Sequence, residues 1–159
     1  SDCKRGKKRV KMSKTIAIDF DGVIHSYHEG WKDGSIYGHP VEGAFEAVQK
    51  LIEEGNSVVI ISTRSPFQIK KWLIPLVMAS EFDARGLGDP ADYCFTRFGF
   101  TLQVVPFWKK FWNKKGVVGI TRRKLPAFCY IDDRAIYFRG RWDDISYDLD
   151  KFKTWQEKT

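Results

Sequence analysis

Short apolar runs alternate along the chain with longer segments in which apolar residues recur every three or four positions. Residues 15–18, 57–61 and 127–131 are runs of mostly apolar residues, each followed by polar side chains. Such short continuous runs are typical of strands buried on both faces of a parallel sheet. Residues 41–54, and a second segment that begins at Pro66, have helical spacing. This alternation predicts a three-layer α/β/α, Rossmann-like fold with a central parallel sheet and no large cap domain.

Four other segments are less regular. Residues 116–120 predict a further strand, and residues 135–142 predict a short strand or a turn before one or two final helices. Residues 23–40, rich in Gly, His, Tyr and Trp, predict a hairpin or flap that includes His25. Residues 81–102 are longer than a connection needs to be, and they are interpreted as an insertion: a partial lid, a dimer contact or a packed loop.

Two carboxylates follow the first apolar run. Asp19 and Asp21 are two residues apart, so both side chains leave the strand end on the same side. Two carboxylates held together repel each other and cost stability unless a cation or a reaction uses them. The alternative is an acidic strand end that is simply solvated or that caps the next helix.

Polar and charged residues also stand beside the other predicted strands. Ser62 and Thr63 follow the second run, Lys124 precedes the third, and Asp132 and Asp133 follow it. In open α/β sheets, ligands collect beyond the carboxyl ends of the strands. The pattern therefore predicts one site built from residues that are far apart in the sequence.

In order, these residues resemble the four motifs of the haloacid dehalogenase (HAD) superfamily: Asp-x-Asp, Ser/Thr, Lys/Arg and a terminal acidic pair. The resemblance covers residues 15–142. It extends to Gly22-Val-Ile-His25 after the first motif, to Gly43-Ala44 at the first helix, and to Ile131-Asp-Asp-Arg-Ala135. It implies a Mg²⁺-dependent phosphatase that forms an aspartyl-phosphate on Asp19.

The resemblance also implies a role for each site residue. Asp19 is the nucleophile and a metal ligand, Asp132 is a further ligand, and Asp133 acts directly or through water. Asp21 supplies a backbone carbonyl to the metal and is the acid and base, for which we expect neighbouring charge and partial burial to raise its pKa. Lys124 and Ser62 stabilise the transferring group. The predicted substrate-binding residues are Gly22, Thr63 and Arg64.

The identity of the motif hydroxyl and the roles of two arginines stay open. The acid at Asp21 separates reaction classes within the family. Either Ser62 or Thr63 is the motif hydroxyl, and Arg64 and Arg134 either recognise substrate or pair with local acids. HAD members that are dehalogenases, phosphonatases or ion-pumping ATPases lack an acid at the position of Asp21. Its presence here favours a phosphatase or phosphotransferase.

Composition and length fit one soluble domain. The chain has 159 residues, of which 43% are apolar and 30% are charged. No apolar run is long enough to cross a bilayer, so no membrane is expected as a partner. Three scattered cysteines do not form a disulfide framework, and Cys129 falls in a predicted core strand, so we expect a reduced, cytoplasmic protein. We expect a flexible basic arm at residues 1–14 and one hydrolase domain at residues 15–159.

Most of the positive charge lies in the arm. Residues 1–11 carry six basic residues against Asp2, a net +5 within the total of +7. Such an arm can bind nucleic acid. Because Met12-Ser-Lys-Thr resembles a natural start, residues 1–11 are either a native arm or sequence upstream of that start.

Residues 103–115 are both aromatic and basic. One interpretation is a surface that stacks on the bases of a single strand. The favoured interpretation is a helix whose apolar face packs in the core, because the apolar residues have helical spacing: Val104, Phe107, Trp108, Phe111 and Trp112. The sequence therefore supports two functional hypotheses. The first is a phosphomonoesterase whose phosphorylated substrates include nucleotides or nucleic-acid ends, and the alternative is a nucleic-acid-binding protein that uses the arm and this helix.

Overall fold

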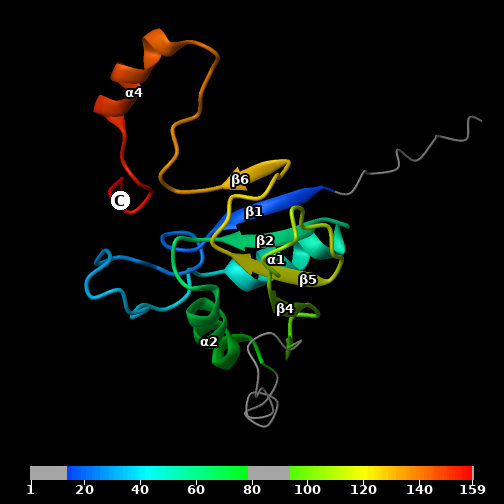
Figure 1. Cartoon of the computed structure of the whole chain (residues 1–159). Coiled ribbons are helices and arrows are strands. Elements are labelled where there is room, and N and C mark those ends of the chain that lie inside the picture. The colour runs from blue at the N-terminus through cyan, green and yellow to red at the C-terminus, as the bar shows by residue number, and fades with distance from the viewer. Residues whose placement is uncertain (1–13, 79–93, 159) are drawn as a thin grey trace, which may run out of the picture.

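The structure, a computed structural model, describes residues 14–78 and 94–158. The elements in chain order are β1 (Thr15–Asp19), α1 (Ala44–Glu53), β2 (Ser57–Ile61), α2 (Pro66–Val77), β3 (Cys94–Phe95), β4 (Thr101–Val104), β5 (Val117–Thr121), β6 (Cys129–Ile131), η1 (Trp142–Asp144) and α4 (Ile145–Lys151). Figure 1 labels all of them except β3 and η1. The predicted arm and most of the predicted insertion at residues 81–102 lie outside the described residues.

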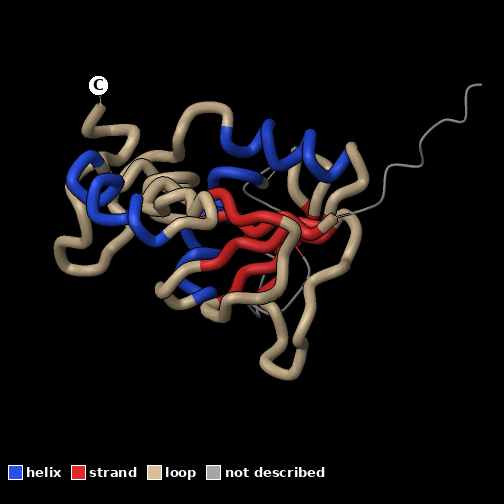
Figure 2. Tube along the Cα trace, turned by 90° about the horizontal axis from the view of Figure 1, so that it is seen from above, coloured by secondary structure: helices blue, strands red, loops and turns tan. Residues whose placement is uncertain are grey.

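The strands form one sheet in the order β3-β4-β5-β2-β1-β6, which Figure 2 shows as a single twisted layer with helices and loops around it. The five strands from β4 to β6 are parallel, and β3 pairs with β4 in the antiparallel direction. Asp19 pairs with Ile61, and Ile61 pairs with Thr121, so the carboxyl ends of three strands lie at one edge. The predicted α/β class, with a parallel sheet and no large cap, is confirmed.

Helices α1 and α2 bury one face of the sheet. The core there contains alternate residues of the central strands, such as Ile16 and Ile18 of β1, together with Ile69 and Leu73 of α2. The residues between these, such as Ala17 and Val59, are buried on the opposite face, which explains the continuous apolar runs of the two central strands. That second face is covered by irregular segments, from which Val105, Trp112 and Leu125 are buried.

The prediction of a helix at residues 103–115 is wrong. β4 occupies Thr101–Val104, and the chain then runs without a helix to β5. Three of the predicted core residues are exposed to solvent: Phe107 at 85%, Trp108 at 69% and Phe111 at 62%. Pro106 lacks the N–H that a continuing ladder or helix would need, and it directly precedes the irregular stretch.

Trp112 decides the path of this segment instead. Its indole Nε1 donates a hydrogen bond to the carbonyl of Val117 at 3.1 Å, and its side chain is 1% exposed. The indole lies against Gly119 of β5, where a Cβ would come within 2.7 Å of the ring. The missing side chain of Gly119 therefore makes the recess that the Trp112 ring fills.

The C-terminal part departs from the prediction at Cys129. β6 is a strand as predicted, but Cys129 and its neighbours are exposed, so the assignment of Cys129 to a buried core strand is wrong. The reason is that β6 is an edge strand. Residues 135–141 form no strand, and α4 follows them as predicted. Figure 1 shows α4 (orange to red) away from the sheet.

The predicted flap at residues 23–40 is irregular and contains no helix. It is joined at its base by a bridge between His25 and Pro40 and by the hydrogen bond from Ser26 N–H to the carbonyl of His39. Among the helices of residues 14–78 and 94–158, none is both long and apolar enough to span a membrane.

We expect Trp112→Ala to lower the free energy of unfolding by about 3–5 kcal/mol, because it removes a fully buried ring and leaves a cavity against β5. Phe111→Ala is the matched control, and we expect it to change stability by less than about 0.5 kcal/mol because that ring is exposed. Urea unfolding of both variants is the measurement. Equal losses would show that the two rings share one buried face, as in the helix that the sequence predicted.

Candidate functional site

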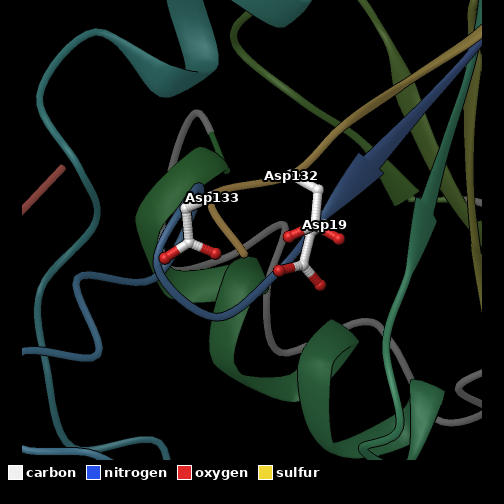
Figure 3. Close-up of side chains that lie close together, drawn as sticks. All are labelled: Asp19, Asp132 and Asp133. Atoms are coloured by element: carbon white, nitrogen blue, oxygen red, sulfur yellow. The ribbon is translucent and has the colours of Figure 1, made fainter. Parts of the chain in front are cut away.

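Three carboxylates meet at the carboxyl edge of the sheet. One oxygen each of Asp19, Asp132 and Asp133 lies within 4.8 Å of the others. Figure 3 shows Asp19 beside Asp132, with Asp133 on the next position of the same loop. The pairing of Ile18 with Ile131 explains the meeting, because the residue after each lies at the same end of neighbouring parallel strands.

Burial and mutual repulsion make these carboxyl groups hard to ionise together. Burial, followed by the charge of Asp132, raises the pKa of Asp19 to about 7, despite a hydrogen bond from the Phe20 backbone. Burial also raises the pKa of Asp133. The Oδ1 atom of Asp133 is buried and has no hydrogen-bond partner among the described residues. A site with excess negative charge and an unsatisfied oxygen fits a divalent cation.

The turn after β1 depends on Gly22. Four backbone N–H groups of residues 22–25 donate to the carbonyls of Phe20 or His25, which closes a tight turn. Gly22 has φ +82°, and a Cβ on it would overlap Oδ2 of Asp133. Any side chain at this position would therefore strain the turn and displace a carboxylate of the cluster.

Lys124 shares a cavity with the cluster. Asp19, Lys124 and Asp132 line a space of about 370 Å³ at the ends of β1 and β6. The Nζ of Lys124 lies 4.8 Å from the centroid of the Tyr130 ring, which holds the chain beside the cavity. The structure thus brings the predicted lysine to the predicted carboxylates.

Neither candidate hydroxyl lines that cavity. Ser62 is buried and its Oγ accepts the backbone N–H of Arg64 at 3.1 Å, whereas Thr63 is exposed. Both residues follow β2, the strand next to β1, at the same edge of the sheet. The choice between Ser62 and Thr63 as the motif hydroxyl stays open.

Asp21 is not among these three clustered carboxylates and has its own partners. Its Oδ1 lies 2.9 Å from Nδ1 of His25, and its Oδ2 accepts a hydrogen bond from Nε of Arg64 at 2.8 Å. Burial alone would raise the pKa of Asp21, but the His25 and Arg64 hydrogen bonds outweigh it and lower the pKa. The expectation of a raised pKa at Asp21 is therefore wrong.

His25 was missed as a partner of Asp21 by the sequence reasoning. Its side chain is fully buried, and its Nε2 accepts the backbone N–H of Gly38 at 2.9 Å. Since Nε2 accepts a hydrogen bond, Nδ1 carries the ring proton and donates a hydrogen bond to Asp21. Gly38 permits this approach, because a Cβ there would lie 2.7 Å from His25 Nε2. The only sequence signal was the spacing of four residues between Asp21 and His25.

Arg64 pairs with a local acid, which is one of the two interpretations that the sequence left open. The guanidinium is 1% exposed, binds Asp21, donates to the carbonyl of Gly34, and lies 4.4 Å from the Trp31 ring centroid. Its Nη2 is buried and has no hydrogen-bond partner among the described residues. Arg134 is exposed, and its backbone N–H donates to Asp132 Oδ1 at 2.9 Å.

Comparisons with known proteins give no functional name. No family model matches the chain, and no curated protein matches it. The chain is similar to a solved structure of a conserved protein from Bacteroides thetaiotaomicron, with 22% sequence identity and a TM-score of 0.40. That similarity covers 92% of this chain and 98% of the other.

A second cavity is lined by part of the same cluster. It has a volume of about 470 Å³, and Gly22, Asp132 and Asp133 line it. Three lysines of the C-terminal segment line it too: Lys151, Lys153 and Lys158. Trp155 fixes this segment, since its Nε1 donates to the carbonyl of Gly22 at 2.7 Å. The sequence reasoning missed these lysines because nothing in a charged C-terminal segment indicates where it packs.

The raised pKa of Asp19 predicts an unusual dependence of stability on pH. In EDTA, the folded protein binds a proton at Asp19 more tightly than the unfolded chain does, so this contribution to stability falls as pH rises from about 4 to about 7. We expect Asp19→Asn to melt at a higher temperature than the wild type at pH 7.5, with a smaller difference at pH 5. Thermal melts at both pH values measure this. A wild type more stable than the variant at pH 7.5 in EDTA would contradict it.

Proposed function

We propose that the protein is a Mg²⁺-dependent phosphomonoesterase that acts through a covalent aspartyl-phosphate on Asp19. One observation carries the proposal: the carboxylate at the end of β1 shares a cavity with Lys124 and lies within 4.8 Å of Asp132 and Asp133. Three carboxylates gathered at one point are suited to a metal, and a lysine that lines the same cavity is suited to a phosphate.

Asp19, Asp132 and Asp133 would hold the Mg²⁺ ion. When bound, the ion neutralises the carboxylates and the substrate phosphate, so that two negative groups can approach each other. The unsatisfied Oδ1 of Asp133 supports this assignment, because a buried carboxylate oxygen without a partner is costly.

Asp19 has the properties of the nucleophile. One carboxylate oxygen forms a bond to phosphorus while the bond from phosphorus to the leaving oxygen breaks, and the electron pair stays on the leaving oxygen. Lys124 stabilises the charge on the transferring group from across the cavity. In the second step, water attacks phosphorus, the bond from phosphorus to the Asp19 oxygen breaks, and inorganic phosphate leaves, which returns Asp19 to its carboxylate form.

Asp21 is better suited to the second step than to the first. Hydrogen bonds from His25 and Arg64 favour its ionised form, which accepts a proton from the attacking water. The same bonds fix the direction of the carboxylate, so His25 and Arg64 are positioning residues for this base. Because its pKa is lowered, Asp21 is seldom protonated near neutral pH and so seldom has a proton to give to a leaving group.

The test of the proposal is hydrolysis of p-nitrophenyl phosphate by the wild type and by Asp19→Asn. We expect turnover with Mg²⁺, none in EDTA, and poor replacement of Mg²⁺ by Ca²⁺ because calcium tolerates higher coordination and can engage both oxygens of Asp19. Asp19→Asn should retain less than about a hundredth of the activity. Asp143→Asn is the matched control, since that carboxylate is 86% exposed and lies outside the cluster. Full activity in EDTA, or in Asp19→Asn, would refute the mechanism.

The partners of Asp21 generate a separate prediction. If Asp21 acts mainly as the base, Asp21→Asn lowers turnover of an aryl phosphate and of an alkyl phosphate by a similar factor, because both give the same aspartyl-phosphate. Steady-state and single-turnover kinetics on the two substrates make the comparison. A loss at least tenfold greater on the alkyl phosphate would show that Asp21 protonates the leaving group, against this expectation.

A further inference from the structure

The segment after β4 exposes aromatic side chains beside a cavity of about 590 Å³. Phe67, Phe107, Trp108, Arg122 and Arg123 are among its lining residues, and we call them the aromatic–basic surface. Phe107 and Trp108 contact each other edge to face, with ring centroids 5.2 Å apart. Large aromatic side chains that gather at a hollow of the surface, rather than singly, mark a binding site.

The aromatic–basic surface is held in place rather than frayed. Arg123 donates hydrogen bonds to the carbonyls of Lys109 at 2.7 Å and of Pro106 at 2.9 Å, which fixes the backbone on both sides of the two exposed rings. Arg122 donates to the carbonyl of Arg64. The rings therefore project from a backbone that is fixed before any partner binds, which lowers the entropy cost of binding.

The stretch of sequence that carries most of this surface has charged residues of one sign only. From residue 93 to residue 131 the sequence has no Asp or Glu, and it has eight basic residues: Arg97, Lys109, Lys110, Lys114, Lys115, Arg122, Arg123 and Lys124. A cluster of cations without interspersed acids attracts a polyanion. Rings interleaved with cations fit a partner that has both phosphates and flat apolar groups.

The aromatic–basic surface lies at the same edge of the sheet as Asp19. In the order β4-β5-β2-β1, β4 is three strands from β1 and β5 is two strands from it. Val104 is the last residue of β4, and Thr121 is the last residue of β5. Neighbouring strands are ~4.8 Å apart, so the surface begins roughly 10–15 Å from Asp19. Arg122 and Arg123 are followed directly by Lys124, which lines the cavity of Asp19.

We propose that the aromatic–basic surface binds single-stranded nucleic acid and directs its terminal phosphate to Asp19. Bases stack on Phe107 and Trp108, while Arg122 and the neighbouring lysines contact the phosphates. A stacked strand rises about 3.4 Å per nucleotide along its axis, so a few nucleotides span the distance to the carboxylate cluster. Binding does not depend on the proposed phosphatase activity, but the delivery of a terminal phosphate rests on it.

Binding is tested in full-length protein that carries Asp19→Asn, so that no phosphate is removed. Fluorescence anisotropy with a labelled 12-nucleotide single strand, and with the duplex of the same sequence, is the measurement. We expect the single strand to bind more tightly, and Trp108→Ala to weaken its binding about tenfold. Trp108→Phe should restore most of that loss because it keeps a ring that can stack. Lys110→Ala should reduce the log–log salt slope by about 0.7 for one lost phosphate contact.

Trp142→Ala is the matched control. Trp142 is 78% exposed and also contacts a phenylalanine, Phe138, with centroids 5.2 Å apart, but it lies on the C-terminal segment. We expect this variant to bind like its parent. Equal losses in Trp108→Ala and Trp142→Ala, or no loss in Trp108→Ala, would overturn the proposal. A preference for the duplex would overturn it as well.

Two other occupants of the surface are distinguishable. Sedimentation velocity shows whether a second copy occupies it: a dimer that Trp108→Ala converts to a monomer, with nucleic-acid binding unchanged, would overturn the proposal. Vesicles of phosphatidylserine and phosphatidylcholine provide the membrane comparison. Binding to these vesicles that depends on Trp108, without single-strand binding, would overturn it too.

Delivery is tested with protein in which Asp19 is intact. We expect Phe107→Ala/Trp108→Ala to raise KM about tenfold or more for 3′- or 5′-phosphorylated oligonucleotides and to leave p-nitrophenyl phosphate hydrolysis unchanged. If p-nitrophenyl phosphate is not hydrolysed at all, the proposed function fails while the binding result on Asp19→Asn still stands. If the double variant changes hydrolysis of the oligonucleotide and of p-nitrophenyl phosphate by the same factor, the delivery of terminal phosphates is refuted.

Discussion

The repulsion between carboxylates at the ends of β1 and β6 is the constraint on which the site depends. The two strands are neighbours and parallel, so their first polar residues are forced together by the hydrogen bonds of the sheet. Folding the sheet therefore brings Asp19, Asp132 and Asp133 within 4.8 Å of one another. The apolar core on the α1 and α2 face supplies the burial energy that offsets this unfavourable cluster.

The two aspartates of the first motif have opposite environments although they are two residues apart. Asp19 lies among carboxylates, and its pKa is raised to about 7. Asp21 is bound by His25 and Arg64, and its pKa is lowered. The tight turn at Gly22 separates them by directing Asp21 toward the flap. One turn thus creates two carboxyl groups with different chemistry.

The parallel sheet and the carboxylate cluster could be predicted from the sequence because both follow from local patterns. Continuous apolar runs indicate buried strands, and polar residues after such runs indicate one edge of the sheet. The bond from Arg64 to Asp21 joins residues 43 apart, and the contact of Gly38 with His25 depends on how the flap folds back, so neither has a local signal. The error at residues 103–115 has the same origin: helical spacing was present, but Pro106 and the recess at Gly119 determined the path.

The hydrogen bond from Trp155 to the carbonyl of Gly22 spans 133 positions, and that of Gln156 to Ser26 spans 130. The turn that carries Asp21 is thus completed by residues that leave the ribosome long after it. A nascent chain that has already paired β1 with β2 still lacks the segment that closes the Gly22 turn from outside. Contacts of such sequence separation form late and slowly, so the core precedes the finished site during synthesis.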